Sequence, residues 1–225
     1  MRHDSFNEST EMYLKTVSEL AVADEPVAIS ALADRLGVSP VSATEMIHRL
    51  RDGGLIDHRP YKGISLTADG RQQADGVIRS HRLWERFLAD QLALPWDQVH
   101  ALACRLEHAT DPQVVDALDR FLGYPATCPH GNPIPRSNNA AGVPSDHALA
   151  GIKPGCTVVI SRIHPETDEL LAYLAELGLV LGKRVTVQEY MPFHGPLVLL
   201  VDGDARYIGL EAAARVYVYP VEETV

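Results

Sequence analysis

The spacing of hydrophobic residues in the first third of the chain predicts two short helices followed by a hairpin. Residues 29–37, ISALADRLG, have the apolar spacing of an amphipathic helix, which Ser30 can cap and Gly37 can end. In the following segment, VSPVSATEMIHRLRDGGLI, Ser39 is a natural N-cap and Pro40 suits the first helical position. The next stretch, LIDHRPYKGISLTADG, reads as two strands around a tight turn. Together these elements predict a winged helix-turn-helix.

The predicted second helix and the hairpin tip suit contact with DNA. We expect the apolar face of this helix to consist of Val41, Met46, Ile47 and Leu50. The small polar residues at its start could then enter a major groove, and the positive tip could meet phosphates. We therefore expect DNA contacts from Ser39, Pro40, Ser42, Thr44, Glu45, Arg49, Arg59, Tyr61 and Lys62. The alternative is a helical fold with an exposed hairpin and no role in DNA binding.

After the hairpin the pattern changes twice. Residues 76–125 have helical spacing, and a segment rich in Pro, Gly, Asn and Ser then runs over 123–151, which marks a boundary. In 152–225, short β-branched runs predict a small barrel or curled sheet, interrupted by one helix that Pro165 opens and Gly178 closes. The predicted fold is mainly α with a smaller β part, in domains at 1–75, 76–142 and 143–225.

Composition narrows the class of protein. The formal net charge of −10 argues against a protein that coats nucleic acid non-specifically. Residues 1–75 carry 8 Lys and Arg against 12 Asp and Glu, so any DNA affinity must come from where the basic side chains are placed. No run approaches the roughly 18 apolar residues of a membrane span, and the polar start has no secretory pattern, so cytoplasmic residence is expected. The three cysteines are far apart, which predicts free thiols or metal ligands.

One helical stripe combines side chains that bind transition metals. In VHALACRLEH, four possible donors fall within about 100° of arc: His100, Cys104, Glu107 and His108. The segment RSHRLWERFL places His81 and Glu85 four residues apart, and the opening helix supplies Glu11 and Met12. Imidazole and carboxylate donors suit Fe²⁺, Mn²⁺, Zn²⁺, Co²⁺ and Ni²⁺, whereas a thiol and a thioether shift the preference toward softer ions.

Each of these residues also has an ordinary structural interpretation. Met12 fits a helix core, and Cys104 fits a small buried hydrophobe. A His four residues before a Glu is common on a solvated helix face. The residues alone therefore leave two possibilities open, a metal site and a plain helical surface.

The order of motifs along the whole chain resembles the diphtheria-toxin-repressor family of iron- and manganese-dependent transcriptional regulators. That order is STEMYL, a winged helix-turn-helix, SHRLWE, VHALACRLEH, GNPIP and a C-terminal β-domain. The most specific parts are H-R-L-x-E at 81–85 and H-x3-C-R-x-E-H at 100–108. The segment GNPIP at 131–135 is similar to the family segment that follows the metal-binding helices.

The resemblance implies two metal sites in each subunit. The primary, regulatory site would use Met12, Cys104, Glu107 and His108. The ancillary site would use His81, Glu85 and His100, and the C-terminal domain would reach it with Glu166 and Glu169. The last of these is a carboxylate where the resemblance leads us to expect an amide.

The resemblance also implies a metal, partners and a function. Because Met12 and Cys104 look like the iron-responsive branch, Fe²⁺ is expected first and Mn²⁺ second, with other divalent transition metals able to bind in vitro. The helical middle domain would form a homodimer that reads a palindromic operator, and the C-terminal domain would be an SH3-like, FeoA-like module.

The implied function is therefore a metal-activated repressor of iron or manganese homeostasis genes, not an enzyme. Two alternatives stay open, a metal-independent winged-helix regulator and a metalloenzyme. The sequence contains no nucleophile elbow, Walker loop or Rossmann glycines that would support a metalloenzyme.

Overall fold

The computed structural model describes residues 8–21, 25–59, 62–136 and 145–221. The chain divides into two compact units. The first unit comprises Met1–His81 with Glu107–Thr110, and the second comprises Arg82–Leu106 with Asp111–Val225. Among the helices of the described ranges, none combines the length and the apolar character needed to cross a membrane.

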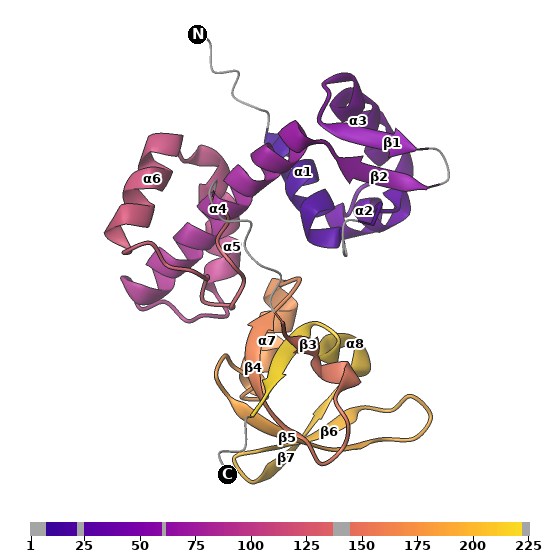
Figure 1. The fold of residues 1–225 in the computed structure, drawn as a ribbon, viewed down its shortest axis with the longest axis vertical. Coiled ribbons are helices and arrows are strands. Elements are labelled where there is room, and N and C mark those ends of the chain that lie inside the picture. The colour runs from indigo at the N-terminus through magenta and orange to yellow at the C-terminus, as the bar shows by residue number, and fades with distance from the viewer. Residues whose placement is uncertain (1–7, 22–24, 60–61, 137–144, 222–225) are drawn as a thin grey trace. The chain divides into compact units, whose positions relative to one another are not determined.

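The first unit contains the predicted winged helix-turn-helix, which is confirmed. Its elements are α1 (Glu8–Leu20), α2 (Ile29–Leu36), α3 (Pro40–Asp52), β1 (Ile56–Arg59) and β2 (Gly63–Leu66), and α4 (Ala68–Asp90) follows. Strands β1 and β2 form an antiparallel hairpin next to the three helices (Figure 1). The apolar core holds the fully buried side chains of Leu14, Leu32, Ile47, Ile56 and Ile64.

Local capping explains two helix boundaries in this unit. Ser39 caps α3, because its hydroxyl oxygen accepts a hydrogen bond from the Ser42 backbone N–H at 3.1 Å. Gly37 ends α2 in the left-handed conformation at φ 64°, as predicted. The prediction for Ser30 was wrong, because α2 already begins at Ile29 and Ala28 occupies the N-cap position.

The second unit begins with the helical segment around α5 (Val99–Leu106) and α6 (Pro112–Phe121). Between them the short 3₁₀ turn η1 (Glu107–Ala109) belongs to the first unit. Within the second unit a small apolar cluster joins α4 and α6 to the segment after α6. Its buried members are Leu83, Val115, Leu118 and Ile134.

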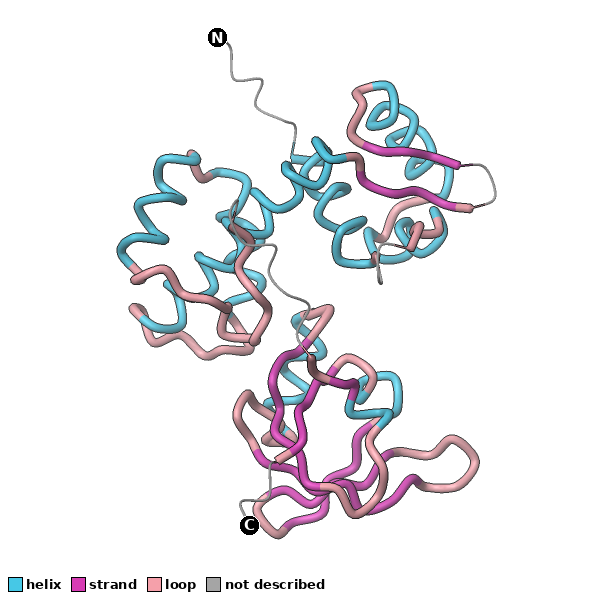
Figure 2. Tube along the Cα trace, in the orientation of Figure 1, coloured by secondary structure: helices cyan, strands magenta, loops and turns pink. Residues whose placement is uncertain are grey.

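The C-terminal part is a curled antiparallel sheet (Figure 2), and residues of its strands and of α7 form one buried apolar core. The strand order is β3-β8-β4-β5-β6-β7. The elements are β3 (His147–Ala148), η2 (Leu149–Gly151), β4 (Thr157–Ile163), α7 (Asp168–Glu176), β5 (Arg184–Tyr190), β6 (Leu197–Val201), β7 (Asp204–Ile208), α8 (Leu210–Ala213) and β8 (Val216–Pro220). This architecture confirms the predicted small β-domain.

The helix inside the β-domain starts later than the sequence indicated. Thr167 is the N-cap of α7, and its hydroxyl oxygen accepts from the Leu170 N–H at 3.3 Å. Pro165 was expected at the helix start but lies before this cap, after a cis His164–Pro165 peptide bond. Gly178 follows the helix in the left-handed conformation at φ 72°, as expected for a helix end.

Candidate metal centres

The first cluster of possible ligands lies in the first unit around Glu107, and we call it the Glu107 cluster: Glu11, Lys15, His81, Glu107 and His108. Helix α1 supplies Glu11 and Lys15, α4 supplies His81, and η1 supplies the last two. His81 Nδ1 lies 2.5 Å from Glu107 Oε2, and His108 Nε2 lies 3.1 Å from Glu107 Oε1. His108 Nδ1 contacts Glu11 Oε2 at 2.5 Å, so η1 is joined to α1 through this histidine.

The Glu107 cluster contains charged side chains that are largely buried from solvent. The Glu107 side chain is fully buried, and Lys15 donates to both of its oxygens, at 3.0 Å to Oε1 and 2.8 Å to Oε2. Burial favours the neutral carboxyl, but His108, His81 and Lys15 hold the pKa of Glu107 well below its usual range. The interaction with Glu107, opposed by burial and reinforced by Glu11, raises the pKa of His108 to about 8.

The second cluster lies in the second unit around Glu85, and we call it the Glu85 cluster: Glu85, His100, Cys128, His130 and Glu166. Glu85 Oε1 lies 3.1 Å from His100 Nδ1 and 3.1 Å from His130 Nδ1. One ligand atom each from Glu85, Cys128, His130 and Glu166 lies within 4.8 Å of the others, and all four residues are buried. Their combination of thiol, imidazole and two carboxylates is a donor set that fits a divalent transition metal.

A tight loop brings Cys128 and His130 to the Glu85 cluster. The Cys128 N–H donates to the Asn132 carbonyl at 2.9 Å, and the His130 carbonyl accepts from the N–H of Ile163 at the end of β4 at 2.9 Å. Asn132 Nδ2 donates to the Ile163 carbonyl at 2.7 Å and to Glu166 Oε2 at 3.1 Å, which orients that carboxylate. Outer contacts of this kind fix ligand side chains before an ion binds.

Gly131 allows this loop to approach β4. Its φ is +83°, and a Cβ built on it would lie 2.1 Å from the Ser161 carbonyl oxygen and 2.8 Å from the Arg162 Cα. Both the backbone conformation and the close contact therefore require glycine. The position of Cys128 and His130 therefore depends on Gly131, which has no side chain that could bind a metal.

Electrostatics prepares the Glu85 cluster for a cation. Burial raises the pKa of the Cys128 thiol, so the thiol is protonated without an ion. Burial disfavours the charged form of His130, but the nearby Glu85 carboxylate holds its pKa well above the usual value. Burial also opposes ionisation of Glu166, yet His164, Arg82 and His130 hold its pKa below the usual range. A divalent ion would therefore displace protons from the thiol and the imidazole.

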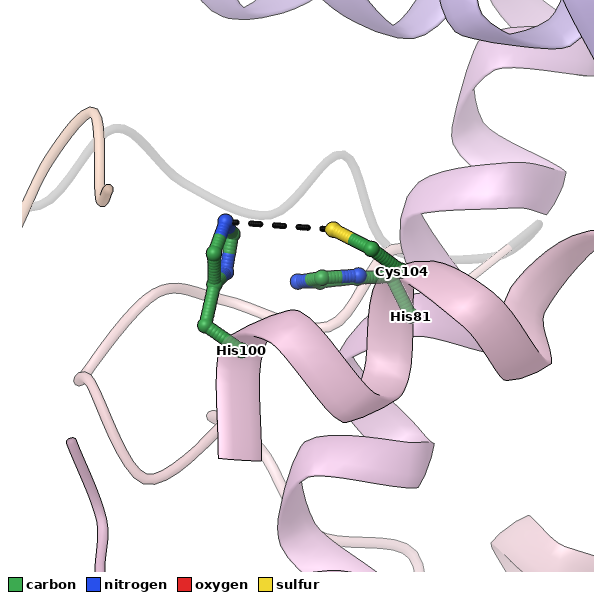
Figure 3. Close-up of side chains that lie close together, drawn as sticks. All are labelled: His81, His100 and Cys104. Atoms are coloured by element: carbon green, nitrogen blue, oxygen red, sulfur yellow. Dashed lines mark hydrogen bonds between the residues drawn. The ribbon is translucent and has the colours of Figure 1, made fainter. Parts of the chain in front are cut away.

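The structure brings some of the expected ligands close together and leaves Glu169 exposed. Cys104 and His100 lie one turn apart on α5, with 3.9 Å between Sγ and Nε2 (Figure 3). Met12 is half-buried on α1, and its carbonyl accepts from the Thr16 hydroxyl. Of the two C-terminal candidates, Glu166 is buried in the Glu85 cluster, whereas Glu169 is exposed on α7.

Cys128 and His130 were missed at the level of sequence. Their Cys-x-His spacing in TCPHGNP was the available signal, but it lies inside the segment interpreted as a boundary. Lys15 was missed as well, since a lysine on a helix ordinarily faces solvent.

The outer face of α3 carries most of the expected DNA contacts. Ser39, Pro40, Ser42, Glu45 and Arg49 are exposed, as are Arg59 and Lys62 beside the hairpin turn. Thr44 is half-buried, and its hydroxyl donates to the Pro40 carbonyl at 2.7 Å. Tyr61 lies outside the described residues.

Val41 departs from the predicted apolar face of α3. Its side chain is 69% exposed, because the core-facing turn of the helix is already filled by Ala43 and Ile47. The outer surface of α3 therefore includes an apolar side chain among polar ones. A shallow hollow there is lined by Pro40, Val41, Thr44, Glu45 and His48.

A winged helix-turn-helix together with the Glu85 cluster, whose buried donors could hold a metal ion, defines a metal-binding protein of the DNA-binding class. Three family models match this chain: the N-terminal DNA-binding domain of iron-dependent repressors over 5–64, their metal-binding and dimerisation domain over 67–136, and the FeoA domain over 147–220.

Full-length relatives agree with the family models. The chain is 34% identical to the iron-dependent repressor IdeR of Mycobacterium leprae, over 87% of this chain and 90% of that protein. It is also 34% identical to the diphtheria toxin repressor of Corynebacterium diphtheriae, over 91% of this chain and 97% of that protein. The structure of a manganese-dependent transcriptional repressor in complex with manganese superposes with a TM-score of 0.84 at 33% identity, covering 94% of this chain and 100% of that one. The chain belongs to the diphtheria-toxin-repressor family.

Proposed function

We propose that this chain is a transcriptional repressor of metal homeostasis genes whose operator binding is activated by a divalent transition metal. The observation that carries the proposal is the Glu85 cluster, in which four buried donor residues converge in a chain that also has a winged helix-turn-helix. Because its relatives are named as repressors, the chain is a regulator and the metalloenzyme alternative is set aside.

We infer Fe²⁺ as the first candidate ion and Mn²⁺ as the second. The relatives include iron-dependent and manganese-dependent repressors, so family membership alone leaves both. The thiol of Cys128, added to two carboxylates and an imidazole, is a softer set than Mn²⁺ prefers. Zn²⁺ should bind in vitro, since thiol and imidazole donors suit it.

The regulatory centre is assigned to Glu107 and His108, with Glu11 added from the structure. Met12 and Cys104 stay in the proposed set on the strength of the resemblance. When bound, the ion would supply positive charge that neutralises the clustered carboxylates. The residues' own part is to join η1 to α1, whose neighbouring side chains Leu14 and Val17 lie in the core of the winged helix-turn-helix. Ligation there would favour the DNA-competent state of this unit through differential affinity.

The ancillary centre is assigned to Glu85, His100, Cys128, His130 and Glu166. The expected ligand Glu169 is retained only as an outer residue, because it is exposed at the start of α7. His81 was expected at this centre. It stays in that predicted set, and its Nδ1 also lies 2.5 Å from Glu107 Oε2.

We further propose a homodimer that binds a palindromic operator in the cytoplasm. The family model over 67–136 is a dimerisation domain, and within it the side chains of Val114, Phe121 and Tyr124 are exposed and apolar. A two-fold dimer presents two copies of α3 to two half-sites. Domain boundaries near 75 and 142 stay part of this proposal, as do base or phosphate contacts from Ser39, Ser42, Glu45, Arg49 and Lys62.

The test is operator binding measured by fluorescence anisotropy across a series of Fe²⁺, Mn²⁺ and Zn²⁺ concentrations. The wild-type chain should bind only with metal, and both Glu107→Ala and Cys128→Ser should lose at least about tenfold in operator affinity, or about 1.4 kcal/mol. Glu211→Ala is the matched control, because this glutamate is exposed on α8 and pairs with Arg215, outside both clusters. Equal operator binding in metal chelator and in excess metal would favour the metal-independent regulator.

A further inference from the structure

We propose that Lys15 is an internal cation that competes with the metal for the Glu107 carboxylate and so sets the metal affinity of the Glu107 cluster. The inference rests on the proposed ligation by Glu107 and His108. Lys15 is 92 residues away in sequence, yet its ammonium bridges both oxygens of the carboxylate at 2.8 and 3.0 Å. The Lys15 side chain is 6% exposed and the Glu107 side chain is 0% exposed.

Both oxygens of Glu107 already face nitrogen atoms of basic side chains in this arrangement. Oε1 lies against Lys15 and His108, and Oε2 lies against Lys15 and His81. An ammonium has three donors and no acceptor, so Lys15 can occupy a cation's place but cannot itself ligate a metal. A metal that takes either oxygen must therefore disturb the pair between Lys15 and Glu107.

Charge makes the competition stronger than simple crowding. Two positive groups a few ångströms apart repel strongly where little water screens them. A metal at Glu107 would repel the ammonium, so metal binding should displace Lys15 toward another partner or solvent. Part of the metal's binding free energy is therefore used to move Lys15.

The position of Lys15 in α1 keeps the ammonium near the carboxylate. Its neighbours Leu14 and Thr16 are buried, and Thr16 also donates to the Met12 carbonyl at 2.7 Å. The helix turn that carries Lys15 is therefore held by the core, and the long side chain alone must move. Lys15 consequently acts on metal affinity through Glu107, as a positioning residue and not as a ligand.

The decisive experiment measures metal dissociation constants of the full chain without DNA, by calorimetry with Mn²⁺ and with Zn²⁺. Lys15→Met keeps most of the apolar stem and removes the charge, so it should bind metal about tenfold more tightly at the Glu107 cluster. Lys15→Arg keeps the charge and should stay within about threefold of wild type. Lys183→Met is the matched control, since Lys183 is half-buried and pairs with Asp202 in the C-terminal domain, outside both clusters. Unchanged or weaker binding by Lys15→Met overturns the inference.

A second measurement on the unaltered protein covers the case in which Lys15→Met folds poorly. Acylation of lysine amines, quantified by mass spectrometry, should label Lys15 several-fold faster with saturating Mn²⁺ than with chelator, and Lys183 equally in both. Equal labelling of Lys15 in both conditions overturns the inference. The proposed function fails separately, if operator binding is equal in metal chelator and in excess metal, whatever Lys15 does.

Discussion

Single residues decide whether the ligands of the Glu85 cluster meet. Cys128 and His130 come from a loop without regular structure, and their places are fixed by backbone hydrogen bonds to Asn132 and Ile163. Gly131 directly follows His130, and its Cα lies so close to β4 that an added Cβ would clash with the Ser161 carbonyl oxygen. A centre built in this way depends on residues that no list of metal-binding side chains would contain.

Gly131→Ala should therefore weaken metal binding without removing a ligand. The added methyl group would meet the Ser161 carbonyl oxygen at 2.1 Å, so the loop must shift and carry Cys128 and His130 with it. We expect at least about tenfold weaker Zn²⁺ binding at the Glu85 cluster, measured by competition with a chromogenic chelator. Gly155→Ala is a matched control, because Gly155 has a similar φ of +85° but nothing within 4 Å of its added Cβ. Equal losses in both variants would attribute the effect to backbone strain alone.

His108 should make the metal-free chain less stable as pH rises. Its pKa is raised from 6.5 to about 8 in the folded chain, so the folded state binds its proton more tightly than the unfolded state. This contribution to stability is complete below about pH 6.5 and is lost as pH rises through 8. Thermal unfolding in chelator between pH 6 and 8.5 measures it. His108→Gln should flatten part of the decline, and His147→Gln, at an exposed position on β3, should leave the decline as in wild type.

At the scale of elements, the sequence predicted the helix ends that depend on contacts between neighbouring residues. Ser39, Pro40 and Gly37 mark their helix ends in the sequence, and the structure uses all three as predicted, because a cap is a contact between near neighbours. The start of α7 was misplaced because Thr167 and Pro165 both offer helix-start signals, and the cap hydrogen bond to Leu170 decides between them. Val41 was predicted on the buried face of α3 but is exposed. The apolar spacing of four residues does not determine which of them the core has room to bury.

The hairpin of β1 and β2 should contact phosphate through Arg59. The Lys62 N–H donates to the Arg59 carbonyl at 3.0 Å, which closes the turn and holds two exposed cations at the tip. Each phosphate neutralised changes the slope of log affinity against log salt by about 0.9. Arg59→Ala should reduce the magnitude of that slope by about one, measured on operator DNA between 50 and 200 mM salt. Arg206→Ala, on β7, should leave it unchanged. An unaltered slope for Arg59→Ala would place the hairpin away from the DNA backbone.

At the scale of the whole molecule, the sequence identified the family and its domain order, but only part of the centres. Glu85, His100 and Glu166 were expected together, and the structure places them in one cluster. Cys128 and His130 could not be derived from helix periodicity, because a loop has no period that brings distant residues to one face. Lys15 with Glu107 is a long-range pair that only the folded chain shows.

Dimer formation should depend on the exposed apolar residues of α6. Phe121 is 64% exposed in the single chain, within the range matched by the dimerisation model. Phe121→Asp would place a charge in an apolar interface, so we expect a shift from dimer to monomer in light scattering and weaker operator binding. Phe193→Asp is the control, because Phe193 is 99% exposed on the loop between β5 and β6. A dimer that persists in Phe121→Asp would place the interface on another surface.

The first compact unit is not a continuous stretch of sequence, and this limits how the chain can be dissected. Its segments Met1–His81 and Glu107–Thr110 are separated by residues that belong to the other unit. A fragment truncated after His81 would lack Glu107, the carboxylate with which the buried ammonium of Lys15 pairs. No single cleavage of the polypeptide releases the intact unit. The DNA-binding part is therefore an obligate portion of a larger folding unit, and recombination or truncation that treats it as an exchangeable cassette should yield a destabilised product.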